Sequence, residues 1–505
     1  MVLKSVTRAF FLFILMIVLL IVFTPILVIL WCYRQVITLV LKIKYGRRFG
    51  GLLGGKDAFW AFEDVSKSII TSVIIVESTK DSNQFIETLR IRIDERLLKK
   101  ESRLTSTREK FGGYCFLIKN QYSLENAFKV INTTTTFDQS YLEKFVQECL
   151  SKEMPKHDTG LWEVLVFDKR AQWLETNKKQ YIFVFRCHHG LGDGFALLDL
   201  LIHQFSDEKI QPETHRTQWE KSGTTTSWFT LLKYALYGPA QVAVEKFSRP
   251  PDANFLHRNN LCGEKIIAWA VEEKPHLVPL VKLMKNQLPE TRFSDVVLCA
   301  ISKSLNDFYS KKSQMVPKHI TCVIPVLLKA RSNGNIFNLT NRYSVGELTL
   351  PVLTDNVLEE VRKYTRILKN SPDIFVYHWL LNIVAFVLPE LALKRIFYSG
   401  HSTAVISILP GFNKISCLDG DTIRDVIYWI PNRGSTGFNA FKSFSNTRFF
   451  VGVGISVLTY ENRLQIGIVV DKELPLNQSD AQMIVDGVFT SIIDLYSSNF
   501  GTFCK

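Results

Sequence analysis

Long and short apolar runs alternate with polar segments along the chain, and their spacing predicts both helices and strands. Residues 9–33 contain 25 residues without a charge, which is long enough to cross a hydrocarbon layer of ~30 Å. Residues 85–97 carry apolar side chains at every fourth position, a spacing typical of an amphipathic helix. Runs rich in β-branched and aromatic residues predict strands, at residues 69–76, 114–116, 161–166, 181–185, 265–271 and 321–328. Residues 452–471 predict two strands joined by a Glu-Asn turn.

The second half of the chain also predicts several helices. Residues 293–308 place Val297, Ile301, Leu305 and Phe308 on one face, with Ser294 as the expected N-cap. Residues 228–247 predict an apolar helix interrupted by Gly238-Pro239, and residues 479–496 predict a final helix. Residues 373–398 are unusually apolar; a buried helix that lines an acyl tunnel, or one that dips into a leaflet, fits better than a second membrane span.

One short stretch combines these patterns with candidate chemistry. The strand at residues 181–185 leads to Arg186-Cys187-His188-His189-Gly190-Leu191-Gly192-Asp193-Gly194, and an apolar helical run follows. Three glycines in five positions allow a sharp turn, and Asp193 stands where a helix N-cap is expected. The sequence therefore predicts two histidines at the end of a strand, then a turn, then a helix.

The histidine pair favours acid–base chemistry over metal binding. Neighbouring strand side chains point to opposite faces, so His188 and His189 are not expected to line one cavity. No H-E-x-x-H motif or cysteine pair stands nearby, and we expect no metal site. A neutral imidazole can accept the proton of an alcohol that attacks an acyl carbonyl, a role worth ~10²–10⁴-fold in rate. The plain structural alternative is a buried, hydrogen-bonded histidine in a strand-to-helix connection.

Bulk properties limit the classes of protein. A chain of 505 residues exceeds one ordinary core, so two domains are expected. The formal charge of +13 suits an anionic membrane surface or an anionic acyl-CoA; no nucleic-acid-binding signature accompanies it, and we expect no nucleic-acid partner. Nine scattered cysteines without CxxC pairs indicate reduced thiols in a cytosol-facing body.

The N-terminal segment predicts a retained membrane anchor. It is too long for a signal-peptide core, and the heavier positive charge after residue 33 places the body in the cytosol. Pro25 allows a kinked single span or a hairpin in one leaflet. The glycines between residues 46 and 55 predict a flexible, basic link to the globular part.

The sequence resembles a known family. His188-His189-Gly190-Leu191-Gly192-Asp193-Gly194 matches the HHxxxDG motif of the CoA-dependent acyltransferase superfamily. From about residue 57 onward the chain is similar to the wax ester synthase/diacylglycerol acyltransferase (WS/DGAT) family, on blocks around residues 56–63, 161–166, 293–301, 321–328, 341–344, 407–411 and 452–471. The resemblance implies that His189 is the general base, that Asp193 is structural and that His188 orients or packs.

Further site residues follow from the same resemblance, together with several departures from the family pattern. Gly194, Asn341 and Arg342 stand in motif positions. Lys329 replaces an arginine, which Arg331 could substitute for. In the family's S-N-x-P-G block Ile408 replaces the asparagine, so Ser407 is the remaining candidate for stabilising an oxyanion.

The resemblance implies an α/β (α+β) protein of two sheet-and-helix lobes, a chloramphenicol acetyltransferase-like fold, with a substrate channel between the lobes. The expected division is 1–50 anchor and link, 51–220 N-terminal lobe, 221–263 connection and 264–505 C-terminal lobe. The expected reaction transfers a long-chain acyl group from acyl-CoA, a co-substrate and not a cofactor, to a fatty alcohol or diacylglycerol. A catalytically inactive lipid-binding protein and an amine acceptor remain alternatives, as do the endoplasmic reticulum and the plasma membrane.

Overall fold

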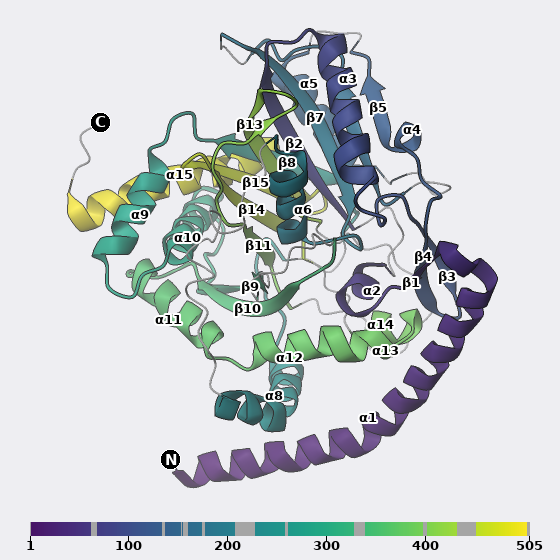
Figure 1. Cartoon of the computed structure of the whole chain (residues 1–505). Helices are drawn as coiled ribbons and strands as arrows, with labels where there is room; N and C mark the ends of the chain where they lie inside the picture. The colour runs from purple at the N-terminus through teal and green to yellow at the C-terminus, as the bar shows by residue number, and fades with distance from the viewer. Residues whose placement is uncertain are drawn as a thin grey trace.

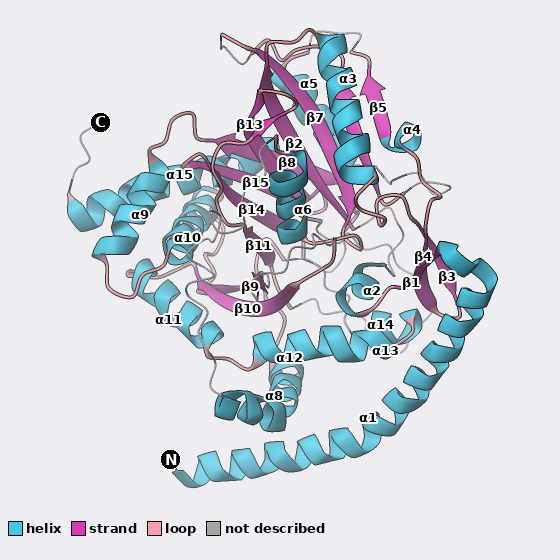
Figure 2. Ribbon diagram, viewed as in Figure 1, coloured by secondary structure: helices cyan, strands magenta, loops and turns pink. Residues whose placement is uncertain are grey.

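The computed structural model describes most of the chain. The described residues are 2–61, 68–133, 137–152, 154, 160–173, 177–207, 228–257, 261–327, 339–396, 401–431 and 451–501. Two six-stranded sheets with helices around them form the body, and a long N-terminal helix runs along one side of it (Figures 1 and 2).

The N-terminal helix α1 spans Val2–Tyr45 and is long and apolar enough to cross a membrane. It continues through Pro25, so the hairpin that this proline allowed is not formed. The sequence predicted a flexible link after this helix, and the structure shows instead that the segment is ordered. A short 3-10 turn (Gly46–Arg48) leads into β1 (Phe49–Leu52), which pairs with β4 (Tyr114–Ile118) and through it joins β3 (Thr107–Phe111). Ile37 and Leu41 of α1 pack on this small sheet, which orders the glycine-rich segment.

The N-terminal lobe is built on the sheet β12-β13-β2-β7-β6-β5. Its strands are β2 (Ile69–Ser78), β5 (Phe128–Ile131), β6 (Trp162–Phe167), β7 (Lys179–His188), β12 (Ser416–Cys417) and β13 (Asp421–Trp429). The helices of the lobe are α2 (Gly55–Ala61), α3 (Ser82–Ile93) with a π-turn to Leu98, α4 (Leu124–Ala127), α5 (Gln139–Ser151) and α6 (Gly194–Leu200) with a π-turn to Phe205. Alternate residues of β2 enter two cores, Ile74 with α3 and Val73 with α5.

The C-terminal lobe is built on the sheet β10-β9-β11-β14-β15-β8. Its strands are β8 (Lys265–Val271), β9 (His319–Leu327), β10 (Tyr343–Pro351), β11 (Ala404–Ile408), β14 (Val453–Tyr460) and β15 (Arg463–Asp471). Its helices are α9 (Leu277–Gln287), α10 (Phe293–Lys311), α11 (Val357–Lys369), α12 (Asp373–Trp379) with a π-turn η5 (Leu380–Val384), α13 (Ala385–Val387), α14 (Glu390–Ile396) and α15 (Gln478–Phe500). The helix α8 (Trp228–Ser248) connects the lobes and continues through Pro239 instead of breaking there.

Most predicted elements are confirmed, including the helix at residues 85–97, the strand β8 and the C-terminal hairpin. Glu461 and Asn462 adopt positive φ angles in the hairpin turn, as its tight connection requires. Two details differ. Ser294 lies inside α10, because Arg292 is the N-cap and Asp295 accepts its backbone N–H. The apolar segment 373–396 is broken into short helices and does not line the apolar cavity described below.

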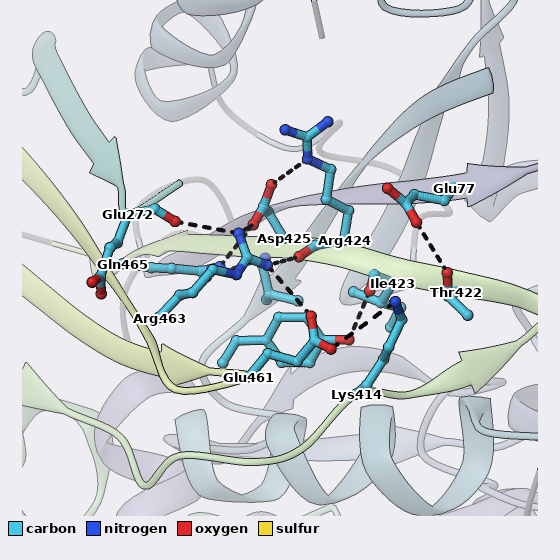
Figure 3. A network of polar contacts seen from close by, with 12 residues as sticks. Glu77, Glu272, Lys414, Thr422, Ile423, Arg424, Asp425, Glu461, Arg463 and Gln465 are labelled. Carbon is cyan, nitrogen blue, oxygen red and sulfur yellow. Dashed lines mark hydrogen bonds and ion pairs between the residues drawn. The ribbon is translucent and has the colours of Figure 1, made fainter. Parts of the chain in front are cut away.

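Strands β12 and β13 come from the second half of the chain but pair in the sheet of the first lobe, β13 lying antiparallel to β2. The division expected from the sequence, in which the C-terminal lobe begins at residue 264, did not predict that these two strands join the sheet of the other lobe. Arg463, at the start of β15, secures the crossover (Figure 3). It lies 2.7 Å from Asp425 of β13 and also donates to the carbonyls of Arg424 and Glu272. Burial raises the pKa of Asp425 although Arg463 opposes this.

We expect Arg463→Met to destabilise the fold by up to about 3–5 kcal/mol, because it removes the closer of two arginines from the buried Asp425 carboxylate and leaves only Arg424, at 3.3 Å, beside it. Thermal or denaturant unfolding of the detergent-solubilised protein measures the loss. Arg366→Met removes an exposed ion pair with Glu290 and should cost at most ~1 kcal/mol. Equal losses in the two variants would contradict a role for Arg463 in joining the lobes.

Candidate active site

The two histidines lie at the end of β7 but in different surroundings. His188 is fully buried, and its Nδ1 accepts the backbone N–H of Gly190 at 3.0 Å, which closes the glycine turn. His189 follows the last strand residue, and its backbone N–H donates to Ser68 at 2.7 Å. Its ring lies against residues of the C-terminal lobe. The two side chains therefore do not share one cavity, as strand geometry predicted.

Asn341 fixes the tautomer of His189. The Asn341 Nδ2 donates to Asp57 at 2.9 Å and to the carbonyl of His189 at 2.7 Å. With its amide nitrogen so engaged, the oxygen Oδ1 is the atom that faces His189 Nδ1, at 2.8 Å. Since Oδ1 only accepts, Nδ1 must carry the ring proton. In the neutral imidazole, Nε2 is then the basic nitrogen.

An ion pair holds Asn341 from behind. Asp57 of α2 accepts the backbone N–H of Asn341 at 3.1 Å and lies 2.7 Å from Arg103. Arg103 also donates to the carbonyls of Leu339 and Gly190. One guanidinium therefore joins the turn after His189 to the segment that supplies Asn341. In the sequence, Asp57 stood out only as part of a block that resembles the family, and no sequence pattern indicated this role.

An aromatic residue fixes the plane of the His189 ring. Trp60 of α2 stacks on it with centroids 3.9 Å apart and planes inclined by 15°. The Trp60 Nε1 donates to the Tyr343 hydroxyl at 2.7 Å, and the Tyr343 ring meets His189 edge-on. With Asn341 at one edge and Trp60 on one face, the imidazole has little freedom to rotate.

Asp193 is the N-cap of α6, as the sequence predicted, and accepts the backbone N–H of Ala196 at 2.9 Å. Its other oxygen accepts the backbone N–H groups of Arg342 and Tyr343 at 2.5 and 2.9 Å. Burial raises the pKa of this carboxyl, while the three backbone donors favour its charged form. Asp193 thus fastens the C-terminal lobe to the turn after β7.

Two more charged groups border this contact. Arg342 lies 3.0 Å from Asp199 of α6, so its side chain also crosses between the lobes. Lys56 is buried, and its Nζ donates to the carbonyl of Arg342 at 3.0 Å and lies 3.4 Å from Nδ1 of His378. Burial lowers the pKa of Lys56 to about 8, although Asp193 and Asp57 act in the opposite direction. Lys56 stands at the start of the block that resembles the family's opening segment, but the sequence did not indicate that its side chain is buried.

A cavity with an almost wholly apolar lining begins at Gly194. It has a volume of about 80 Å³ and lies between the N-terminal sheet, α6 and the ends of β11 and β14. Gly194, Leu197, Leu201 and Phe205 line it from the helix side. Eleven residues separate Gly194 from Phe205, which corresponds to roughly 16 Å of helix. A side chain at position 194 would press on Leu409, so glycine keeps this end open.

The structure does not bring Ser407 to the His189 cluster. The Tyr428 hydroxyl lies 2.9 Å from the carbonyl of Ser407 and 3.1 Å from its hydroxyl, and we see no contact with His189 in the described part of the chain. Lys329 and Arg331 lie outside the described residues. Among the described residues no group of His, Cys, Asp and Glu is arranged to hold a metal ion. The eight cysteines described are free thiols.

Comparisons with solved structures place this fold among acyltransferases and condensation domains. The wax ester synthase/diacylglycerol acyltransferase from Marinobacter aquaeolei is 12% identical, with a TM-score of 0.55 over 87% of this chain and 98% of that chain. The trichothecene 15-O-acetyltransferase from Fusarium sporotrichioides is 12% identical, with a TM-score of 0.57 over 87% and 94%. The first condensation domain of the calcium-dependent antibiotic synthetase is 10% identical, with a TM-score of 0.55 over 89% and 96%.

The chain therefore has the two-lobed fold of acyltransferases and condensation domains. Residues 339–495 match the model of the WS/DGAT C-terminal domain, and the resemblance to the WS/DGAT family is thereby confirmed. This segment contains Asn341 and Arg342, whereas the HHxxxDG motif lies before it. No curated protein matches the chain.

The buried ammonium of Lys56 predicts a pH effect on stability. The folded chain binds this proton more weakly than the unfolded chain, so the wild type gains stability as the pH rises from about 8 toward 10.5. Lys56→Met lacks this gain. We expect the difference in melting temperature, variant minus wild type, to be largest at pH 7 and to fall toward pH 10. Lys282→Met, at an exposed lysine of α9, is the control. A difference independent of pH would contradict a weakened, buried ammonium.

Proposed function

We propose that this protein is a membrane-anchored acyltransferase that transfers a long-chain acyl group from acyl-CoA to the hydroxyl of a lipid alcohol. The WS/DGAT domain and the fold support the acyl-CoA-dependent acyltransferase activity. The observation that carries the proposal is the immobilised imidazole of His189 at the junction of the lobes, with Nδ1 bound to Asn341 and the ring stacked on Trp60.

His189 Nε2 removes the proton of the acceptor hydroxyl as its oxygen attacks the thioester carbonyl. The tetrahedral intermediate then expels the CoA sulfur, which takes the proton back from the imidazolium. The products are an ester and free CoA, and the imidazole is again neutral. Asn341 accepts from Nδ1–H throughout and so stabilises the imidazolium without receiving the proton. The acceptor is a long-chain fatty alcohol, giving a wax ester, or diacylglycerol, giving triacylglycerol.

The apolar cavity that begins at Gly194 supports the proposal that the transferred acyl group is long. Its lining offers few polar groups and therefore suits methylene groups rather than a headgroup. Burial of each methylene contributes ~0.8 kcal/mol. The helix α1 supports membrane anchoring, since it is long and apolar enough to span a bilayer. An anchored body on the cytosolic side, at the endoplasmic reticulum or the plasma membrane, would meet acyl-CoA in water and the acceptor in lipid.

The activity test uses the full chain in detergent micelles with labelled palmitoyl-CoA and, in turn, hexadecanol, diacylglycerol and hexadecylamine. We expect ester products, and a loss of ~10²–10⁴-fold in kcat for His189→Ala. His319→Ala, at an exposed histidine of β9, is the matched control and should keep full activity. Acyl-CoA binding without any product, or unchanged turnover in His189→Ala, would contradict the proposal. An amide as the main product would show that the acceptor is an amine and not an alcohol.

The cavity assignment has a separate test. Ser72 of β2 lines the cavity and is only partly buried. Ser72→Phe should fill the space and exclude the end of a long chain; the loss of four buried methylenes costs about 3 kcal/mol, or ~100-fold in kcat/KM. We expect this loss with palmitoyl-CoA and little loss with octanoyl-CoA, while Ser72→Ala remains like wild type. A loss that follows the chain length of the alcohol instead would assign the cavity to the acceptor.

A further inference from the structure

Exposed apolar side chains gather on two elements beside α1. On α8, Trp228 and Phe229 are 63% and 64% exposed, and Leu232 and Leu236 follow them along the helix. On the segment from η5 to α14 the exposed apolar residues are Ile383, Phe386 and Leu391. We call these seven residues the apolar shoulder. Figure 1 shows α1, α8 and α12–α14 on the same side of the molecule.

The shoulder is continuous with the apolar part of α1. Near its N-terminal end, Phe13 meets Tyr237 of α8 with ring centroids 6.3 Å apart. Near its C-terminal end, the buried Arg34 lies over the Phe386 ring of α13, 4.2 Å from its centroid. Twenty-one residues separate Phe13 from Arg34, which corresponds to about 32 Å of helix. The body thus follows α1 over most of its apolar length.

From this continuity we infer that the body itself docks on the lipid bilayer through the apolar shoulder. The uncharged part of α1, residues 10–33, is apolar on all faces and therefore suits a lipid phase, which the adjoining shoulder would also meet. Exposed lysines and arginines lie on the neighbouring elements, with Lys233 on α8, Lys42 and Lys44 at the end of α1 and Arg47 and Arg48 in the turn after it. Such cations attract anionic headgroups.

Docking would bring the bilayer within one helix layer of the proposed catalytic base. The shoulder segment packs closely on α2. A Cβ atom at Gly54 would lie 2.5 Å from Phe386, and one at Gly55 would lie 2.8 Å from the carbonyl of Leu381. The same short helix carries Trp60, which stacks on His189. A lipid acceptor could therefore reach His189 from the bilayer beside α2. This last step rests on the proposed acyl transfer, whereas the docking itself rests only on the proposed membrane anchoring by α1.

The test places an environment-sensitive fluorescent amino acid in the full chain, reconstituted into vesicles that contain anionic lipid and nitroxide-labelled lipid. Positions 229 and 391 report on the shoulder, and position 21 reports on α1. Met315, the control, is 90% exposed on the loop after α10. We expect quenching and a blue shift at 229, 391 and 21, and neither at 315. Quenching at 21 alone would overturn the inference, since α1 would then be a simple tether. Protection of 229 and 391 without quenching, in a particle of doubled mass, would also overturn it and indicate a dimer.

An activity measurement separates this inference from the proposed function. Phe229→Glu combined with Leu391→Glu should lower turnover at least tenfold with a bilayer-embedded alcohol, yet leave turnover with a short, water-soluble alcohol near wild type. Met315→Glu should change neither. Quenching at 229 and 391 in a protein that forms no ester would leave the docking surface established and the proposed function wrong. An active protein without quenching at positions 229 and 391 would leave the proposed function established and the docking surface wrong.

Discussion

The buried carboxylate of Asp193 is the contact on which the rest of the site depends. It caps α6 on one side and accepts two backbone N–H groups, those of Arg342 and Tyr343, on the other. Because carboxylate hydrogen bonds of this kind are short and strong, they fix the segment that precedes β10 against the turn after β7. Asn341 immediately precedes these two donors, and its amide is thereby held against His189. The orientation of one imidazole is thus set by a bond between the lobes.

A second set of contacts ties the same imidazole to α2. Trp60 covers one face of the ring, and Asp57 holds the Asn341 amide in the orientation that fixes the tautomer. Both residues lie on one short helix, whose N-terminus packs against η5 and α13 through Gly54 and Gly55. The apolar shoulder and the candidate base are therefore connected through α2. A displacement of the apolar shoulder therefore has a direct structural route to the site.

The exchange of β12 and β13 shows why the two lobes act as one unit. Strand β13 is paired with β2 in the N-terminal sheet, while Arg463 and Gln465 of β15 bind its residue Asp425. Separation of the lobes would expose this buried charge pair together with the core shared by the two sheets, to which Trp429 and Ile267 belong. The cavity at Gly194 lies at the same junction and takes Tyr428 and Leu458 from the second half of the chain. Its shape is consequently fixed by the crossover.

The sequence by itself determined the local elements and the position of the motif. Period-2 and period-3.6 apolar patterns are properties of a few neighbouring residues, which is why β8, the helix at residues 85–97 and the C-terminal hairpin could be predicted closely. The glycine turn and the capping role of Asp193 are likewise local. The tertiary structure alone decided which distant side chains meet His189, since Asp57, Trp60 and Asn341 come from segments 132, 129 and 152 positions away in the numbered chain. It also decided that the glycine-rich link becomes a strand, that β13 changes sheets and that Lys56 is buried. Those outcomes depend on what packs against each segment, and no local pattern of residues contains that information.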